Sequence, residues 1–572
     1  MLARRMRILD RRRFLTAVSS AAGFGLVAPW LGSCGSKTAV PAILQLDDGK
    51  IFDLSVASAD PSATGVVLWT HLRREQVVPG RSLYFQVSDD ALFSRLTVEG
   101  KIEADDIGAA HDFTVRVDLD GSLAPGRVYF YRFVYGDRTT RAGRCRTLPA
   151  AGNSSLTLGM VTCQDYTNGY YGAFRHLSDD DVDFVVHLGD FIYESAGDPR
   201  FQTLPFADRQ VILPSGGKVA MGLDDYRAAY ATYRRDPDLQ RALERHTFIF
   251  VSDDHETAND CYWDYARDTL GAPDHPLRAD AGALRQLKRD SQKAWLEYVP
   301  ARVVADETAA HPHRALTAYR EFAFGDLVRY LALDTRSYRS PHPCGEGDIF
   351  QRYLPLTCSD YSLPMRSILG EAQRPWLVDR LSAAGTTWRV LGNQTFFGRL
   401  TLGGLRPVPI NVDAWDGFEA ERVWLTGEVQ SRGVSDLVIL TGDLHSTIAS
   451  EVKADYGSIN PFDRKNVIGV EFMTPSVTSS ALFDSILSGL GGGNPTLATG
   501  LGAGAIRLAN PHIKFFDSAA HGYSTISFAR DHCEWTAYAI DKDVAPPATT
   551  TRRVLARFRK DRASTTLVDQ GV

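Results

Sequence analysis

Five apolar runs along this chain share one feature, because each ends on polar residues whose side chains can bind a metal ion. The runs cover residues 156–161, 182–188, 248–251, 388–391 and 437–440. They are rich in β-branched and aromatic residues, which is typical of strands buried on both faces of a sheet. The residues that follow them are TCQD (162–165), GDFIYE (189–194), SDDHE (252–256), GNQ (392–394) and TGDLH (441–445). Since ligands bind at the carboxyl ends of strands in open α/β sheets, these endings predict one shared site.

The spacing of these patterns predicts two domains. Between residues 47 and 148, short alternating runs are separated by turn signals, as in a β-sandwich. These runs cover residues 64–70, 83–87, 113–117 and 128–135. Between residues 152 and 545, the strands mix with stretches of helical character at 223–234, 278–298 and 371–384. A chain of 572 residues is long enough to give both domains a core.

Each candidate ligand also has a purely structural explanation. Gly189 permits a sharp exit that would deliver Asp190 to a site, but Asp is also a usual capping residue of helices. Cys163 could be a small buried hydrophobe, Tyr193 a core aromatic and Asn393 a turn residue. The agreement of five strand endings favours a metal site over these separate explanations.

The motifs GDFIY, DDHE and GDLH resemble the metallophosphoesterases, in the variant of the alkaline phosphatase D (PhoD-like) family, which is related to the purple acid phosphatases. Further landmarks are residues 52–72, 123–137, 334–340, 415–422 and 471–480. One departure is Ser58-Ala59-Asp60, where the family more often has Ser-Gly-Asp. The resemblance implies an α/β fold of the α+β type, with an N-terminal fibronectin- or Ig-like β-sandwich followed by a metallophosphoesterase α/β/β/α sandwich.

The resemblance also implies a binuclear or larger metal centre. The ligands implied for Fe³⁺ are Cys163, Asp190, Tyr193 and His445. Asp190 would bridge to a divalent ion, expected to be Ca²⁺ with another divalent metal as the alternative. The further oxygen donors are Asp254 and Asp443, with Asp165 or Asn393 as additional candidates. Phenolate and thiolate favour the oxidised state of iron, whereas Ca²⁺ takes six to eight oxygen ligands in loose geometry.

Such a centre would hydrolyse a phosphate ester with metal-activated water. Asp254-His255-Glu256 resembles the Asn-His-Glu run of related phosphoesterases, with Asp in place of the metal-binding Asn. This assigns catalytic roles to Asp254, through the metal, and to His255, which would stabilise the phosphoryl group or protonate the leaving oxygen. A structural His beside a metal carboxylate is the alternative. Arg336 and Arg339 could contact phosphate or form salt bridges.

The expected function is therefore that of an exported phosphatase or phosphodiesterase whose partner is a phosphate-ester substrate. Two alternatives stay open. One is a phospholipase D-type hydrolase of lipid head groups on the same scaffold. The other is a surface binding lipoprotein whose metal site is inactive. The first 33 residues carry a net charge of +5, so the net charge changes from −6 to −11 without them, which argues against a nucleic-acid-binding surface.

The first 33 residues are expected to be a twin-arginine signal peptide, read by the twin-arginine export machinery. DRRRFLT (10–16) resembles its consensus, and the apolar stretch that follows is short and interrupted by Gly23, Gly25 and Pro29. Leu31-Gly32-Ser33-Cys34 resembles a lipobox, which would make a lipid on Cys34 the only membrane anchor. A chance cleavage site is the alternative. The predicted location is periplasmic or at the cell surface.

Three further predictions concern the second half of the chain. Cys344 and Cys358 enclose a short loop and are candidates for a disulfide in an oxidising compartment, worth about 3 kcal/mol in the entropic model. The glycine-rich residues 488–505 predict a mobile loop. Residues 546–572 are expected to be a tail, in which the basic stretch 550–562 could form a short helix.

Overall fold

The computed structural model describes residues 41, 43–199, 202, 206–306, 308–347, 349–403, 407–457, 464–482 and 495–572. The predicted signal peptide and Cys34 lie outside these residues. The chain divides into two compact units. Unit 1 contains Met1–Leu148, Gln240–Thr247 and Glu297–Arg302, and unit 2 contains Pro149–Leu239, Phe248–Leu296 and Val303–Val572. No helix of the described residues is long and apolar enough to cross a membrane.

Unit 1 is rich in β-structure and has one apolar core. One sheet has the order β1 (Gln45–Leu46), β8 (Arg138–Thr139), β7 (Val128–Tyr135), β4 (Leu83–Ser88) and β5 (Leu96–Ile102), and β9 (Gly143–Arg146) also pairs with β7. The antiparallel strands β2 (Val56–Ser62), β3 (Gly65–His71) and β6 (Thr114–Asp118) form the other layer. Leu68 of β3 belongs to the same buried cluster as Phe85 of β4 and Tyr131 of β7, so alternate residues of both layers fill the core.

Unit 2 contains two large sheets. The strands of the first are, in spatial order, β27 (Leu567–Asp569), β26 (Arg552–Asp561), β25 (His532–Ile540), β24 (His521–Ala529), β10 (Ser155–Val161), β11 (Phe184–His187) and β12 (Thr247–Phe250). Those of the second are β17 (Arg320–Phe324), β18 (Val328–Ala332), β19 (Trp388–Gly392), β20 (Leu437–Thr441), β22 (Val467–Met473), β21 (Thr447–Lys453) and β23 (Ile513–Asp517). Strands β10 to β12 are parallel, as are β18, β19, β20 and β22.

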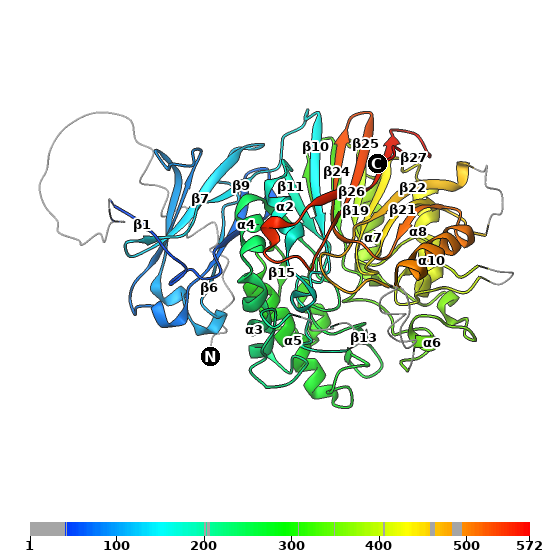
Figure 1. Cartoon of the computed structure of the whole chain (residues 1–572), viewed down its shortest axis with the longest axis horizontal. Coiled ribbons are helices and arrows are strands. Elements are labelled where there is room, and N and C mark those ends of the chain that lie inside the picture. Colours follow the sequence, from blue (N-terminus) through cyan, green and yellow to red (C-terminus); the bar gives the residue numbers. More distant parts are fainter. Residues whose placement is uncertain are drawn as a thin grey trace, which may run out of the picture. The chain divides into compact units, whose positions relative to one another are not determined.

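The two sheets of unit 2 pack face to face through aromatic side chains. The rings of Trp388 and Phe528 lie 5.9 Å apart, and those of Phe472 and Trp535 lie 4.9 Å apart. Helices α7 (Gly370–Ser382) and α8 (Glu419–Ser431) bury apolar residues in one cluster with β18, β19 and β20 of the second sheet. Helix α2 (Gly172–Asp179) contacts β24 of the first sheet. Figure 1 shows this succession of helices and strands, and the predicted α/β fold class is confirmed.

Further helices are α3 (Leu223–Arg234), α4 (Pro237–Arg245) and α5 (Ala281–Tyr298), besides α10 (Pro495–Ala509), which is described below. The predicted stretch 223–234 matches α3, and 278–298 contains α5. The five apolar runs form strands β10, β11, β12, β19 and β20. Their periodicity and composition were therefore sufficient to identify them.

The predicted helix at 550–562 is wrong, because strand β26 occupies most of this stretch. Ala556, Phe558 and Lys560 are buried, whereas Arg557 is exposed, and this alternation is that of a strand. The basic composition had suggested a solvated helix, but β26 pairs with β25 along its length. Residues 546–572 are accordingly not a loose tail, since β26 and β27 extend the first sheet.

The predicted loop at 488–505 is also wrong where it overlaps helix α10 (Pro495–Ala509). Proline is well suited to the first turn of a helix, because its φ is already helical and its missing N–H would have no partner there. The Ala and Leu residues that follow favour a helix strongly enough to tolerate three internal glycines. Residues 488–494 lie outside the described part of the chain.

Candidate metal centre

The candidate ligands are collected by the carboxyl ends of parallel strands. Cys163 follows β10, Asp190 follows β11, and Asp253 and Asp254 follow β12 in the first sheet; Asp443 follows β20 in the second. The strand ends are tied together directly, since the amide of Cys163 donates to the carbonyl of Gly189 at 3.1 Å. The fold therefore brings the ends of these strands together, as the sequence predicted.

Three overlapping groups of side chains bring donor atoms within 4.8 Å of one another. They are Cys163 with Asp190 and His445, Asp190 with Asp254 and His255, and Asp253 with Asp254 and Asp443. Asp190 belongs to the first and second groups, and Asp254 to the second and third. Such shared carboxylates are what a cluster of neighbouring cations requires, because one carboxylate can bridge two ions.

Four of these residues have an unusual backbone conformation. Cys163, Asp190, Asp443 and His445 have φ values of 53°, 57°, 67° and 50°, although none of them is glycine. Left-handed backbone is sparsely populated by residues with a Cβ atom, and it concentrates at functional sites. Gly189 adds a related constraint, because a Cβ atom there would lie 2.5 Å from Cβ of Asp253. The strand ends are therefore bent to aim these side chains at one point.

Tyr193 joins the first group through its hydroxyl. Its oxygen lies 3.1 Å from Nε2 of His445 and 3.2 Å from Oδ2 of Asp190, and the residue is only 1% exposed. Nδ1 of His445 lies 2.7 Å from the carbonyl oxygen of Ser480, which can only accept. Nδ1 must therefore carry the proton, and Nε2 presents its lone pair to the group. Thiol, phenol, imidazole and carboxylate thus converge here.

The donor set fits bound cations. Oδ2 of Asp253 is buried and has no hydrogen-bond partner among the described residues. Burial, with a smaller contribution from Asp253, raises the pKa of Asp190 well above its usual range. Burial also raises the pKa of the Cys163 thiol and of the Tyr193 phenol well above their usual ranges. Positive charge at this point would offset the repulsion between buried carboxylates and stabilise the deprotonated ligands.

Arg336 holds several of these carboxylates in place. Its guanidinium bonds Asp253 through Nε, Asp413 through Nη1 at 2.6 Å and Asp443 through Nη2 at 2.6 Å. The side chain is 2% exposed, so these pairs are nearly free of solvent. The sequence suggested that Arg336 contacts phosphate or forms salt bridges, and the structure shows the salt bridges. Asp413 also accepts from Nε2 of His342 at 2.9 Å and pairs with Arg339 at 3.1 Å.

Asp413 and His342 were not predicted as part of the site. Neither follows a predicted strand, and both lie in stretches without a recognisable ligand spacing. Asp413 comes just before the landmark at 415–422, which was the only signal in its neighbourhood. The guanidinium and imidazole partners hold the pKa of Asp413 well below its usual range despite burial. It therefore anchors Arg336 as a carboxylate.

His255 lies beside the first group with its own acidic partner. Its Nδ1 is 2.7 Å from Oε2 of Glu194, and its ring centroid is 4.0 Å from that of Tyr193. Burial opposes a charged imidazole, but the Glu194 carboxylate outweighs it and raises the pKa of His255 well above its usual value. A protonated His255 can donate a proton or a hydrogen bond to an anionic oxygen.

Two other candidates are engaged elsewhere. The carboxylate of Asp165 accepts from the amide and hydroxyl of Thr167, at 2.9 and 2.8 Å, and from Gln202 at 2.9 Å. It belongs to none of the donor groups of the described residues. The amide oxygen of Asn393 accepts from the indole of Trp415 at 3.1 Å. Sequence alone gives the strand ending but not the partner that each side chain chooses.

Cys344 and Cys358 form a disulfide bond. The other cysteines of the described part of the chain, Cys145, Cys163, Cys261 and Cys533, are buried and carry free thiols.

Comparison with protein families identifies the family of this chain. Residues 158–537 match the model of the PhoD-like phosphatases. The chain belongs to the PhoD-like phosphatase family. Residues 39–149 match the N-terminal domain of PhoD-like phosphatases. The resemblance inferred from the strand endings is therefore confirmed.

Two relatives extend this result over most of the chain. Alkaline phosphatase D of Bacillus subtilis (strain 168) is 29% identical over 590 aligned residues, which cover 98% of this chain and 91% of the relative. A solved structure described as that of PhoD has a TM-score of 0.77 at 26% identity and covers 92% of this chain and 93% of that chain. This member of the PhoD-like family is a hydrolase of phosphoric ester bonds.

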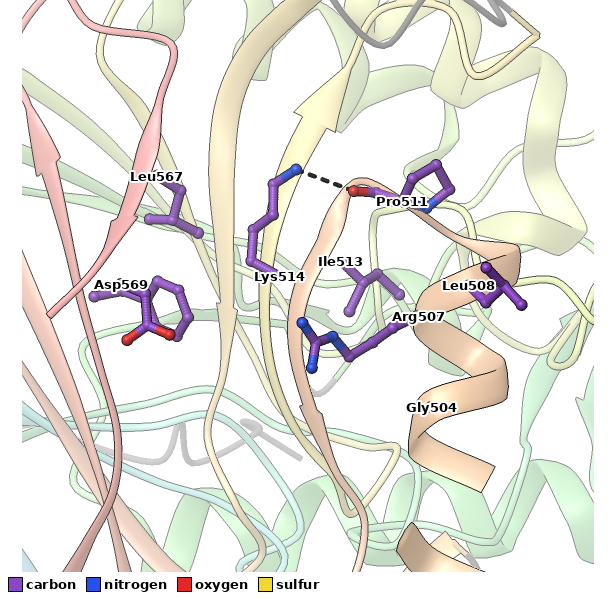
Figure 2. A pocket seen from close by; sticks show the side chains of 9 residues that line it. Gly504, Arg507, Leu508, Pro511, Ile513, Lys514, Leu567 and Asp569 are labelled. Atoms are coloured by element: carbon purple, nitrogen blue, oxygen red, sulfur yellow. Dashed lines mark hydrogen bonds between the residues drawn. The ribbon is translucent and has the colours of Figure 1, made fainter. Parts of the chain in front are cut away.

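A surface hollow of about 550 Å³ lies elsewhere in this PhoD-like chain. It is lined by Gly504, Arg507, Leu508, Pro511, Ile513, Lys514, Phe558, Leu567 and Asp569. Figure 2 shows that Lys514 turns to the carbonyl of Pro511, to which it donates at 3.0 Å. No candidate ligand of the donor groups lines this hollow.

Replacing Arg336 tests the role of the buried ion pairs. Arg336→Met should lower the free energy of unfolding of metal-free protein by about 3–5 kcal/mol, because it leaves buried carboxylates without a cation. Urea unfolding in the presence of a chelator measures the change. Arg559→Met is the matched control, since Arg559 pairs with Asp561 at a partly exposed position and its loss should cost at most about 1 kcal/mol. Equal effects of the two substitutions would contradict the role of Arg336.

Proposed function

We propose that this chain is an exported, metal-dependent phosphatase or phosphodiesterase that hydrolyses phosphate esters with water activated by Fe³⁺ and a divalent ion, expected to be Ca²⁺. The observation that carries the proposal is the sharing of Asp190 between two unlike donor groups. On one side of Asp190 stand the thiol of Cys163 and the imidazole of His445, with the hydroxyl of Tyr193. On the other side stand Asp254 and His255, and Asp254 also belongs to the third group with the carboxylates of Asp253 and Asp443.

The two sides suit different ions. Cys163, Asp190, Tyr193 and His445 would hold Fe³⁺, since thiolate and phenolate are strong anionic donors that stabilise the oxidised state. Asp190, Asp254 and Asp443 would hold the divalent ion with oxygen atoms, and Asp253 lies close enough to contribute. When bound, such ions lower the pKa of a coordinated water and neutralise the oxygens of a phosphoryl group.

His255 would act on the departing group. It is held by Glu194, and its ring is tilted against that of Tyr193 beside the shared Asp190. The Glu194 carboxylate raises the pKa of His255 well above its usual value and so favours the protonated imidazole. That proton would be given to the leaving oxygen, while Glu194 fixes the imidazole by accepting from Nδ1. Asp254, which precedes His255, would act through the divalent ion.

The proposed metal identities predict a visible colour. Protein purified with its native metals should contain iron and absorb in the visible range, because phenolate and thiolate transfer charge to Fe³⁺. Tyr193→Phe should shift or remove this absorption while leaving the divalent ion bound, and Asp190→Asn should reduce the content of both metals. Metal analysis and absorption spectroscopy measure these changes. A colourless, iron-free enzyme with full activity would exclude the assigned roles of Cys163 and Tyr193.

The role of His255 predicts a dependence on the leaving group. His255→Gln should reduce kcat by about 10²–10⁴-fold for an ester with a poor leaving group, because that oxygen needs a proton. The reduction should be much smaller for an activated aryl ester, and metal content should be unchanged. Rates on an aryl phosphate, its bis-ester, an alkyl phosphate and phosphatidylcholine also compare phosphatase, diesterase and lipid-hydrolase activities. Equal losses on all leaving groups would argue for a structural role.

Export and lipidation are proposed from the motif at 10–16, the lipobox-like residues 31–34 and the Cys344–Cys358 disulfide. Mass spectrometry of the mature protein should find Cys34 as the first residue with a covalent lipid. Cys34→Ser should release the protein from the membrane fraction. An unmodified amino terminus at another position would refute lipidation. Cleavage of the signal peptide before residue 34 without a lipid would still agree with export.

A further inference from the structure

One landmark of the sequence, the stretch 471–480 with the letters EFMTPSVTSS, has no role in the proposed chemistry. Its second half leaves β22 and passes directly over the end of β10. The amide of Val477 donates to the carbonyl of Thr162 at 3.0 Å, and the amides of Thr478 and Ser479 donate to that of Cys163 at 3.4 and 3.3 Å. This segment is therefore fixed to a candidate iron ligand by its backbone.

The hydroxyl of Ser479 reaches further into the site. Its Oγ lies 2.6 Å from the phenolic oxygen of Tyr193 and 2.8 Å from the carbonyl of Cys163, and it accepts from the amide of Asp165 at 3.3 Å. Ser479 is only 1% exposed, so water does not compete for these bonds. Oγ of Ser479 is therefore closer to the phenolic oxygen than Nε2 of His445 or Oδ2 of Asp190 is.

The hydroxyl of Ser479 has one proton, and two acceptors lie within reach: the oxygen of Tyr193 and the carbonyl of Cys163. The carbonyl of Cys163 already receives the amides of Thr478 and Ser479. The oxygen of Tyr193 has no other neighbour that must donate to it, because Asp190 accepts and Nε2 of His445 presents a lone pair. A phenol that binds a metal ion has lost its own proton and can only accept. The proton of Ser479 is then directed to Tyr193.

We propose that Ser479 is a positioning residue that donates a hydrogen bond to the phenolate of Tyr193 and thereby sets how strongly that phenolate donates electrons to its metal ion. This inference rests on the proposed iron site. The hydrogen bond withdraws electron density from the phenolate, so it makes the oxidised metal less strongly preferred. In the same turn the carbonyl of Ser480 fixes His445. Residues 477–480 thus orient three of the four candidate iron ligands.

The substitution Ser479→Ala tests this role, with absorption spectroscopy and redox titration as readouts beside activity. Loss of the hydrogen bond makes the phenolate a stronger donor, so the visible band should move to longer wavelength and the reduction potential should become more negative. Ser479→Thr keeps the hydroxyl and should restore the band and the potential.

Thr478→Val is the matched control. Its hydroxyl donates to the carbonyl of Asp165 at 2.6 Å and ties down the same segment without reaching Tyr193. It should leave the band and the potential at their wild-type values. If Thr478→Val shifts them as Ser479→Ala does, the segment is only a structural support and the inference is wrong.

The outcomes separate this inference from the proposed function. A wild-type enzyme without iron or colour would overturn the iron site itself. A coloured wild type whose spectrum and potential are unchanged in Ser479→Ala would overturn the role of Ser479 and leave the iron site standing. A folded Ser479→Ala protein, checked by circular dichroism, is expected because the substitution only removes one atom from a buried position.

Discussion

The crowding of buried carboxylates at one edge of the sheets is the constraint on which the rest of the site depends. Asp190, Asp253, Asp254 and Asp443 are brought together by strands that the fold holds in register; the first three are buried, and the side chain of Asp443 is 14% exposed. Buried charges of one sign are costly without compensation. The guanidinium of Arg336 neutralises part of this charge. Metal ions would complete the compensation.

The same constraint explains the strained backbone. A strand continuing straight would carry its next side chain along the sheet edge, away from the neighbouring strand ends. Left-handed φ values at Cys163, Asp190, Asp443 and His445 turn these residues inward instead. Each such residue costs about 1–3 kcal/mol, which the surrounding hydrogen bonds must offset. The hydrogen bonds that the amides of residues 477–479 donate to the carbonyls after β10 are part of that support.

Sequence predicted the strands and the residue types at their ends because both depend on local pattern. Buried parallel strands need continuous apolar runs, and Cys163, Asp190 and Asp443 come immediately after them. The partners of those residues could not be predicted in the same way. Arg336, Asp413 and Ser479 are separated from their contacts by many residues, and their spacing carries no periodic signal. For residues 550–562, local composition suggested a helix, whereas pairing with the neighbouring strand β25 imposed a strand.

The division of the site into two unlike halves follows from one short turn after β20. Asp443 and His445 are two residues apart, and both have left-handed φ. Asp443 nevertheless joins the carboxylate group with Asp253 and Asp254, whereas His445 joins Cys163 and Asp190. One turn therefore supplies an oxygen donor to one half and a nitrogen donor to the other. The separation of sulfur, phenol and imidazole from carboxylate oxygen is therefore built into the backbone rather than left to the choice of ion.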